Sequence, residues 1–218
     1  MRSHDCKQGT DEWLQLRAGI PTASELDNLI APATLKLRSG DGPHTYLLRK
    51  LAERWLGGTL ASFRSGEMEQ GSLLEEEAIP FFELRIGVDI DRPGFLSTDD
   101  GRFGCSPDGL IVGRDMGIEI KCPQPTNHLR WLLEDECPNE HWLQCQGGMF
   151  VTGYRSWYFA SYCRDFPKLV RVVERDDDAM DAIAEAVASF TEKIEAAHAS
   201  LVQANGGPRV EELDDHPF

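Results

Sequence analysis

The spacing of apolar residues changes in the middle of this chain, and that change constrains the fold more than any other feature. Up to residue 84, apolar residues recur at intervals of three and four, which is typical of amphipathic helices. From residue 94 to residue 122 they form short runs separated by glycines, which is typical of short strands. Helical spacing returns after residue 126, so we expect an α/β (α+β) protein with a central mixed sheet.

The expected elements begin and end at recognisable signals. Gly19 and Gly57 can supply left-handed helix stops, and Thr22 with Glu25 three residues later resembles a capping box. The expected helices cover 11–17, a segment starting at Thr22, 44–56, 71–84, 126–153, and a long final helix with Ile183, Val187, Phe190, Ile194 and Leu201 on one face. The expected strands cover 94–97, 103–105, 109–112, 117–122 and a hairpin of 157–162 with 169–173. We expect one domain over residues 1–218, ending in a loose polar tail at 206–218.

Composition narrows the class of protein. Apolar residues make up 41% and charged residues 27% of the 218, as in a folded soluble protein. No apolar run approaches the ~20 residues that span a bilayer, and the first residues lack an apolar leader. The six cysteines form no CxxC pair and no zinc spacing, which favours reduced thiols. We therefore expect a cytoplasmic protein.

The net charge of -15 argues at first against a nucleic-acid partner, because Lys and Arg supply most of the affinity for phosphates. The charge is unevenly distributed. Residues 1–66 hold nine basic and seven acidic residues, a net of +2, whereas residues 67–218 hold 13 basic and 30 acidic residues, a net of -17. A locally basic channel is compatible with this distribution, and some carboxylates would be reserved for metal ions.

Asp108, Glu119 and Lys121 form the pattern with the clearest chemistry. Side chains alternate along a strand, so Glu119 and Lys121 share one face, and the turn at 113–117 can bring Asp108 beside Glu119. Two carboxylates and the backbone carbonyl of Ile120 would suit Mg²⁺. Lys121 could then orient and deprotonate a water molecule, and burial near a cation would lower its pKa. An exposed Glu–Lys pair on a solvated edge strand has the same spacing, so the pattern alone leaves both interpretations open.

Six ordered blocks of sequence resemble a known family. Asp108 with Glu119-Ile120-Lys121 matches the PD-(D/E)xK nucleases, and the wider pattern resembles the lambda exonuclease family (phage alkaline exonuclease, YqaJ-type). The blocks cover 16–25, 71–75, 105–110, 117–123, 142–146 and 157–162, the last continued by 172–176, within a resemblance over roughly residues 10–200. The resemblance implies a restriction-endonuclease-like core, in which helices flank a central mixed β-sheet.

The resemblance also implies roles for single residues. Asp108, Glu119 and Glu75 would bind the metal, Lys121 would activate water, and Gln144 would lie near the scissile phosphate. Arg17, Ser24 and Ser106 would hold the 5′-phosphate of the digested strand, and Met68 would wedge the strands apart. Five of these residues have an ordinary alternative: Arg17 as a solvated helix-end cation, Ser24 as a cap, Ser106 as turn support, Glu75 as part of the solvated run 75–77, and Met68 as core packing.

The activity that the resemblance implies is 5′-to-3′ digestion of one strand of linear duplex DNA into mononucleotides. The cofactor would be Mg²⁺, with Mn²⁺ able to substitute. A ring-shaped homotrimer would hold the remaining single strand, with Arg38, Arg49 or Arg54 lining its channel. A single-strand annealing protein would be the recombination partner, in a bacterial host that carries a phage or prophage gene.

Four other interpretations stay open at this point. They are a PD-(D/E)xK endonuclease, a related nuclease with an iron–sulfur cluster, a non-catalytic DNA-end-binding module and a purely structural protein. An iron–sulfur cluster needs four cysteine ligands, and Cys137, Cys145 and Cys163 lack the close spacing of such nucleases.

Overall fold

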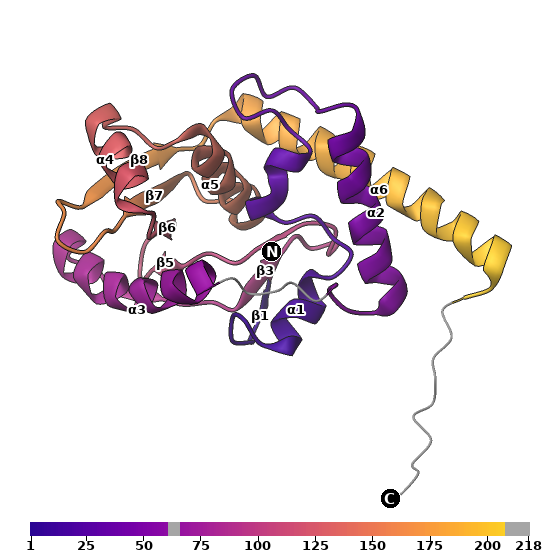
Figure 1. Ribbon diagram of the computed structural model, residues 1–218, viewed down its shortest axis with the longest axis horizontal. Helices are drawn as coiled ribbons and strands as arrows, with labels where there is room; N and C mark the ends of the chain where they lie inside the picture. The colour runs from indigo at the N-terminus through magenta and orange to yellow at the C-terminus, as the bar shows by residue number, and fades with distance from the viewer. Residues whose placement is uncertain (61–65, 208–218) are drawn as a thin grey trace, which may run out of the picture.

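The computed structural model describes residues 1–60 and 66–207, with residues 66–73 described by their backbone alone. Its strands form two sheets (Figure 1). The smaller sheet is antiparallel and joins β1 (Arg2–His4), β3 (Phe95–Ser97) and β4 (Gly104–Cys105). The larger sheet has the order β2 (Ile90–Asp91), β5 (Gly109–Ile111), β6 (Met116–Lys121), β7 (Ser156–Ser161) and β8 (Leu169–Glu174). Its strands β6 and β7 are parallel and the other pairs are antiparallel, so the predicted mixed sheet is confirmed.

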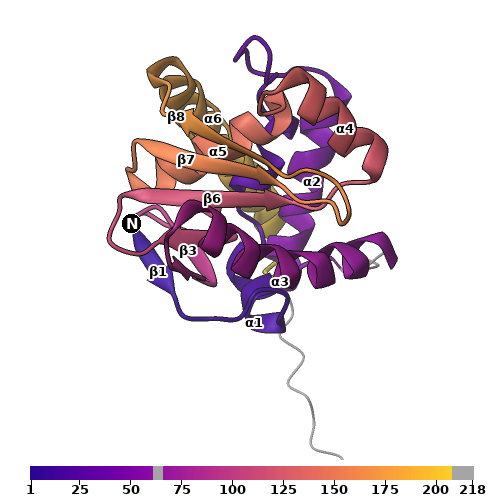
Figure 2. The same ribbon diagram turned by 90° about the vertical axis from the view of Figure 1, so that its left-hand side faces the viewer.

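Helices cover both faces of the larger sheet, as Figure 2 shows for α3 below β6. Helix α3 (Gly66–Ile86) packs Ala78, Ile79 and Phe82 against Ile118 and Ile120 of β6. Helices α4 (Pro125–Glu134) and α5 (Asn139–Thr152) cover the opposite face, where apolar side chains from both helices meet β7 and β8. The sheet is therefore buried on both sides, which explains the long apolar runs of its strands.

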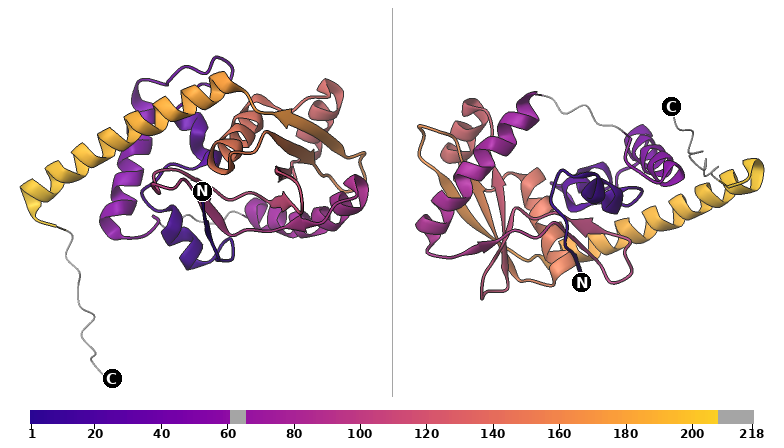
Figure 3. Two further views of the ribbon diagram at one scale, coloured as in Figure 1. Left: turned by 180° about the vertical axis from the view of Figure 1, so that it is seen from behind. Right: turned by 90° about the horizontal axis from the view of Figure 1, so that it is seen from below.

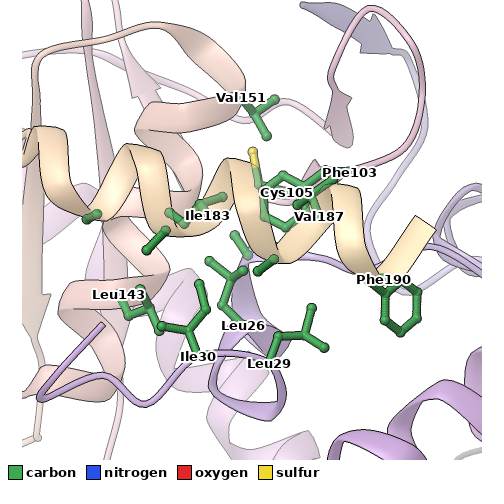
Figure 4. Close-up of a cluster of buried hydrophobic side chains, with 14 of the residues drawn as sticks. Leu26, Leu29, Ile30, Phe103, Cys105, Leu143, Val151, Ile183, Val187 and Phe190 are labelled. Carbon is green, nitrogen blue, oxygen red and sulfur yellow. The ribbon is translucent and has the colours of Figure 1, made fainter. Parts of the chain in front are cut away.

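Two N-terminal elements pack on helices rather than on the large sheet: the 3₁₀ helix η1 (Ala23–Asn28) packs on α5, and α2 (Asp41–Leu56) packs on the long α6 (Asp177–Asn205). Helix α1 (Asp11–Arg17) instead contacts Ser106, just after β4, through Trp13 and Arg17. Figure 3 shows α2 and α6 side by side. A buried cluster joins η1, β4, α5 and α6, and its labelled members in Figure 4 are Leu26, Leu29, Ile30, Phe103, Cys105, Leu143, Val151, Ile183, Val187 and Phe190.

Three local details differ from the predictions. Thr22 is the N-cap residue of η1, as expected, but its hydroxyl donates to the Glu25 carboxylate instead of accepting a capping hydrogen bond from the backbone. The helix expected over 126–153 is broken at 135–138, since Asp135 is left-handed (φ 60°) and Pro138 disfavours helix at the residue before it. Leu201 is 36% exposed, because α6 extends there beyond the buried cluster.

The other expected helices and strands are observed with shifts of a few residues at their ends, and the strands β1 and β2 were not expected. Of the predicted tail at 206–218, residues 208–218 lie outside the described residues, and the single-domain organisation stays a prediction. In the part of the chain that the structure describes, none of the helices has the length and apolar character to span a membrane.

Candidate active site

The register of β5 and β6 places Asp108 opposite Glu119. Gly109 pairs with Ile118 and Leu110 with Gly117, so Asp108 follows in register where the ladder ends. The Asp108 Oδ2 atom accepts a hydrogen bond from the Ile120 N–H at 2.5 Å. The N–H and C=O groups of one strand residue face the same neighbour. The Ile120 carbonyl is therefore directed to the side where Asp108 lies.

Glu119 lies on a central strand and is only 4% exposed. The alternative of a solvated edge strand is therefore excluded. Its Oε1 atom accepts hydrogen bonds from Lys121 Nζ at 2.6 Å and from Gln144 Nε2 at 2.6 Å. Helix α5 thus delivers Gln144 to the carboxylate that β6 presents. The structure brings Asp108, Glu119, Lys121 and Gln144 together, while their catalytic roles stay predictions.

Glu75 adds a third carboxylate from α3. Burial raises its pKa, and the charge of Glu119 raises it further, while Arg92 and Lys121 lower it. Burial also raises the pKa of Asp108 well above its usual range, and the charges of Glu119 and Glu75 add to that rise. Glu76 and Glu77 are exposed, so Glu75 differs from the rest of its acidic run. Neighbouring carboxylates repel one another when they are ionised, which raises their pKa values. A bound cation would remove this repulsion and lower the pKa values again.

The donor set suits Mg²⁺ with few protein ligands. In the described residues, no group of three or more His, Cys, Asp and Glu side chains forms a ready-made metal cage. Lys121 and Gln144 occupy one oxygen of Glu119, and Arg92 occupies one of Glu75. The oxygen donors that lie closest to one another are those of Asp108, Glu119 and the Ile120 carbonyl. Mg²⁺ commonly binds one or two carboxylates together with water and substrate phosphate. The residues present therefore fit a hard divalent cation.

In the protein without a metal the pKa of Lys121 is raised, so the lowering that we expect beside a bound cation stays a prediction. Burial lowers the pKa, but the charges of Glu119 and Asp108 and the hydrogen bond to Glu119 outweigh burial and raise it. Lys121 is accordingly an ammonium group at neutral pH, and it holds Glu119 in place.

Arg92 is a site residue that the sequence did not indicate. Its Nη2 atom lies 3.2 Å from Glu75 Oε1, and its side chain is about half exposed at 46%. Arg92 follows β2, the two-residue strand that pairs with β5. A strand of two residues leaves no periodic signal, so only the tertiary structure brings Arg92 to the carboxylates.

The three residues expected to bind the 5′-phosphate, Arg17, Ser24 and Ser106, lie together, because Arg17 contacts both serines. Its Nη1 atom donates to Ser106 Oγ at 3.2 Å, and its Nη2 atom donates to Ser24 Oγ at 3.5 Å and to Thr22 Oγ1 at 3.4 Å. Trp13, a second residue that the sequence did not indicate, donates from Nε1 to Ser106 Oγ at 2.8 Å. The Arg17 guanidinium lies 4.3 Å from the centre of the Trp13 ring, a cation–π contact.

Neutral hydroxyls are the hydrogen-bond partners of this cation. Burial lowers the pKa of Arg17, and the more distant charges of Glu25 and Glu53 oppose that effect. A partly desolvated guanidinium is a strong donor for an anion that arrives from solution. The alternative of a freely solvated helix-end cation does not describe Arg17.

The remaining predicted residues are less informative. The side chain of Met68 lies outside the described residues, so its role as a wedge stays a prediction. Of the cations expected in a channel, Arg49 pairs with Glu25 and Arg54 with Glu195, while Arg38 is exposed. All six cysteines are free.

Comparison with known proteins was made by sequence and by structure. The sequence model of the YqaJ-like viral recombinase domain matches residues 12–155. The uncharacterized protein YqaJ of Bacillus subtilis (strain 168) is 30% identical over 146 residues, which cover 63% of this chain and 46% of the relative. This chain thus spans about half the length of that curated relative.

Comparison with solved structures shows which proteins share the fold of this chain. An alkaline exonuclease from Laribacter hongkongensis is 26% identical with a TM-score of 0.79, covering 89% of this chain and 97% of the other. Its complex with dAMP is 27% identical over the same shares, with a TM-score of 0.80. A phage-related exonuclease from Haemophilus somnus 129PT, 15% identical with a TM-score of 0.66 over 84% and 96% of the chains, shares the fold. The predicted fold and resemblance are confirmed, and the chain belongs to the YqaJ-like viral recombinase family.

Proposed function

We propose that this chain is a Mg²⁺-dependent exodeoxyribonuclease. It digests one strand of linear duplex DNA from a 5′-phosphorylated end, in the 5′-to-3′ direction, and leaves a 3′ overhang for recombination by strand annealing. The contact of Arg17 with Ser106 carries the proposal, because Ser106 lies only two residues from Asp108. Two residues of extended chain span about 7 Å, so a terminal phosphate on Arg17 would lie roughly one nucleotide from the carboxylates.

The residues of the site divide the chemistry between them. Asp108, Glu119 and the Ile120 carbonyl would hold the metal, with Glu75 as a further acidic residue of the metal site. The metal when bound supplies charge for the phosphate and lowers the pKa of water. Lys121 keeps Glu119 fixed through its 2.6 Å contact. Its ammonium group would supply a positive charge to the scissile phosphate. Gln144 donates to the same carboxylate and can offer its amide to a phosphate oxygen. The guanidinium group of Arg17 would bind the terminal phosphate through two parallel N–H···O hydrogen bonds.

The Laribacter relative supports the proposal in two respects. It is an alkaline exonuclease, and it binds dAMP, a mononucleotide of the kind that stepwise digestion would release. Retention of Asp108, Glu119 and Lys121 in one cluster favours catalysis over a non-catalytic end-binding module. An endonuclease with the same metal site is the second candidate, and it would cut DNA that has no ends.

The deciding experiment compares three DNA substrates. They are linear duplex with 5′-phosphate ends, the same duplex with 5′-hydroxyl ends, and a covalently closed circle, each with Mg²⁺ or with EDTA. We expect cleavage of linear DNA only, preference for the 5′-phosphate, and no cleavage in EDTA. Cutting of the circle would favour the endonuclease, and binding without cleavage would favour the end-binding module.

The assembly, the partner and the location belong to the same proposal. We infer a ring-shaped homotrimer around the remaining strand, an annealing protein as the partner, and action in the cytoplasm of a bacterial host. Light scattering should give three times the mass of the chain, and the mass of one chain would contradict the ring. A pull-down of a single-strand annealing protein by this chain would test the partner.

A further inference from the structure

Lys50 is a buried cation outside the carboxylate centre. It lies in α2 and is 3% exposed. Its Nζ atom lies 3.0 Å from Glu25 Oε2 and 3.1 Å from Glu53 Oε2. A buried ammonium group is costly unless carboxylates compensate it, and removal of one partner leaves an uncompensated charge. The three charges therefore act as one unit.

The two carboxylates of this unit hold both ends of the turn that follows Arg17. Glu53 accepts a hydrogen bond from the Gly19 N–H at 3.1 Å, and Glu25 accepts one from the Thr22 hydroxyl at 2.9 Å. Gly19 has φ +73°, and a Cβ atom there would lie 2.9 Å from the Cβ of Arg54. The turn is thus pressed directly against α2, and Lys50 joins its two anchors.

The direction of the hydrogen bonds links this unit to Arg17. An ionised carboxylate only accepts, so the single hydrogen of the Thr22 hydroxyl is committed to Glu25. The lone pairs of that hydroxyl then face the donor Nη2 of Arg17 at 3.4 Å. Tyr46 adds a further donor to Glu25 at 3.2 Å. A series of contacts thus runs from Lys50 through Glu25 and Thr22 to Arg17. These contacts fix the orientation of the Arg17 guanidinium.

We propose that Lys50 is a positioning residue for the terminal phosphate: it clamps Glu25 and Glu53 so that Arg17 is held ready for a 5′-phosphate. This inference rests on the proposed function, in which Arg17, Ser24 and Ser106 bind that phosphate. Lys50 has a second effect, because it offsets two carboxylates that would otherwise repel the incoming dianion. Burial alone would raise the pKa of Glu25, and Lys50 is the strongest influence that lowers it.

The test is the ratio of cleavage rates on 5′-phosphate and 5′-hydroxyl duplex, measured in single turnover with Mg²⁺ below the melting temperature of each variant. We expect Lys50→Met to reduce that ratio at least about tenfold, the effect of one lost charge-assisted contact. The rate on 5′-hydroxyl DNA should stay within about twofold of wild type. Lys50→Arg, which keeps the cation, should recover most of the ratio. Anisotropy of both duplexes in EDTA should show the same loss in binding alone.

Glu195→Gln is the matched control. It breaks the ion pair of Arg54 with Glu195 at 2.9 Å, which starts from the same helix but faces α6. Its ratio should equal that of wild type. If Lys50→Met does not fold, Thr22→Val removes the linking hydroxyl and should lower the ratio similarly.

An unchanged ratio in folded Lys50→Met, or an equal fall of both rates, would overturn the inference. A wild-type protein that cleaves linear DNA without preferring a 5′-phosphate would remove the phosphate pocket from the proposed function, and this inference with it. A wild-type protein that cleaves no DNA would instead refute the proposed activity.

Discussion

Replacing Asp108 with Asn should stabilise the metal-free protein while abolishing its activity. Asp108 is partly buried beside two carboxylates, and burial is the largest cause that raises its pKa well above the usual range. The folded state therefore binds this proton more tightly than the unfolded chain, whose Asp pKa is about 3.9. As the pH rises above that value, the free energy of unfolding falls, because ionisation is harder in the folded protein. Asn removes this penalty at neutral pH.

Burial is the largest cause of the raised pKa, and the charges around Asp108 give an order of magnitude for the part of the effect that burial does not supply. At separations of about 6 Å and an effective dielectric constant of about 20, each charge pair is worth about 3 kcal/mol. Glu119 and Glu75 repel Asp108 while Lys121 attracts it, which leaves one such repulsion unbalanced. The weaker bond from the Ile120 N–H to a neutral amide costs about 1 kcal/mol. We therefore expect Asp108→Asn to gain about 2 kcal/mol, or about 4–8 °C in melting temperature.

Urea and thermal unfolding at neutral pH, each with EDTA and with excess Mg²⁺, would measure this gain. In EDTA the variant should be the more stable protein. Added Mg²⁺ should stabilise the wild type and leave the variant nearly unchanged, because ligand binding stabilises only the state that binds. Asp100→Asn is the control, because a hydrogen bond from Thr98 lowers the pKa of Asp100. Removal of the Asp100 charge should therefore not raise the free energy of unfolding. A variant less stable than wild type in EDTA would refute this account of the centre.

Three further predictions concern the centre. Lys121→Ala should reduce cleavage by at least about a hundredfold and leave DNA affinity in Ca²⁺ within about threefold; near-normal turnover would remove Lys121 from the mechanism. We expect the half-exposed Arg92 to contact a DNA phosphate, so Arg92→Ala should weaken DNA binding about threefold to tenfold and lower the salt slope by about one. Exposed Arg102→Ala should change neither, and equal values for the two variants would refute the phosphate contact. The Mg²⁺ concentration for half-maximal cleavage should rise as the pH falls from about 8 to about 5, because protons compete for Asp108 and Glu75, and a pH-independent value would contradict their raised pKa values.

Local spacing was enough to predict the pairing at the carboxylate centre. Asp108 and Glu119 are separated by one short hairpin, so strand alternation and turn length place them opposite each other. The charge state of Lys121 was not predictable in this way. Its pKa depends on how closely Glu119 and Asp108 approach, and distances of that kind come from packing rather than from periodicity.

Contacts between segments that are distant in the sequence could not be predicted from the spacing of residues alone. Arg17 and Ser106 are 89 residues apart and meet because α1 packs beside β4, so only the family resemblance indicated them. Trp13 and Arg92 lie outside the residues that the resemblance assigned, and tertiary packing alone reveals them. Lys50 is similarly hidden, because in the sequence it is one of several cations on an amphipathic helix.

The parallel pairing of β6 with β7 has a consequence for how the protein folds. Asp108 and Glu119 meet through a local hairpin, which closes a loop of only about ten residues and can form within microseconds. Gln144 reaches Glu119 from the crossover through α4 and α5, which connects β6 to its parallel partner β7. Non-local pairing of this kind is slow. During refolding, a carboxylate pair should therefore form first, and recovery of nuclease activity should lag behind it, timed by the docking of the crossover.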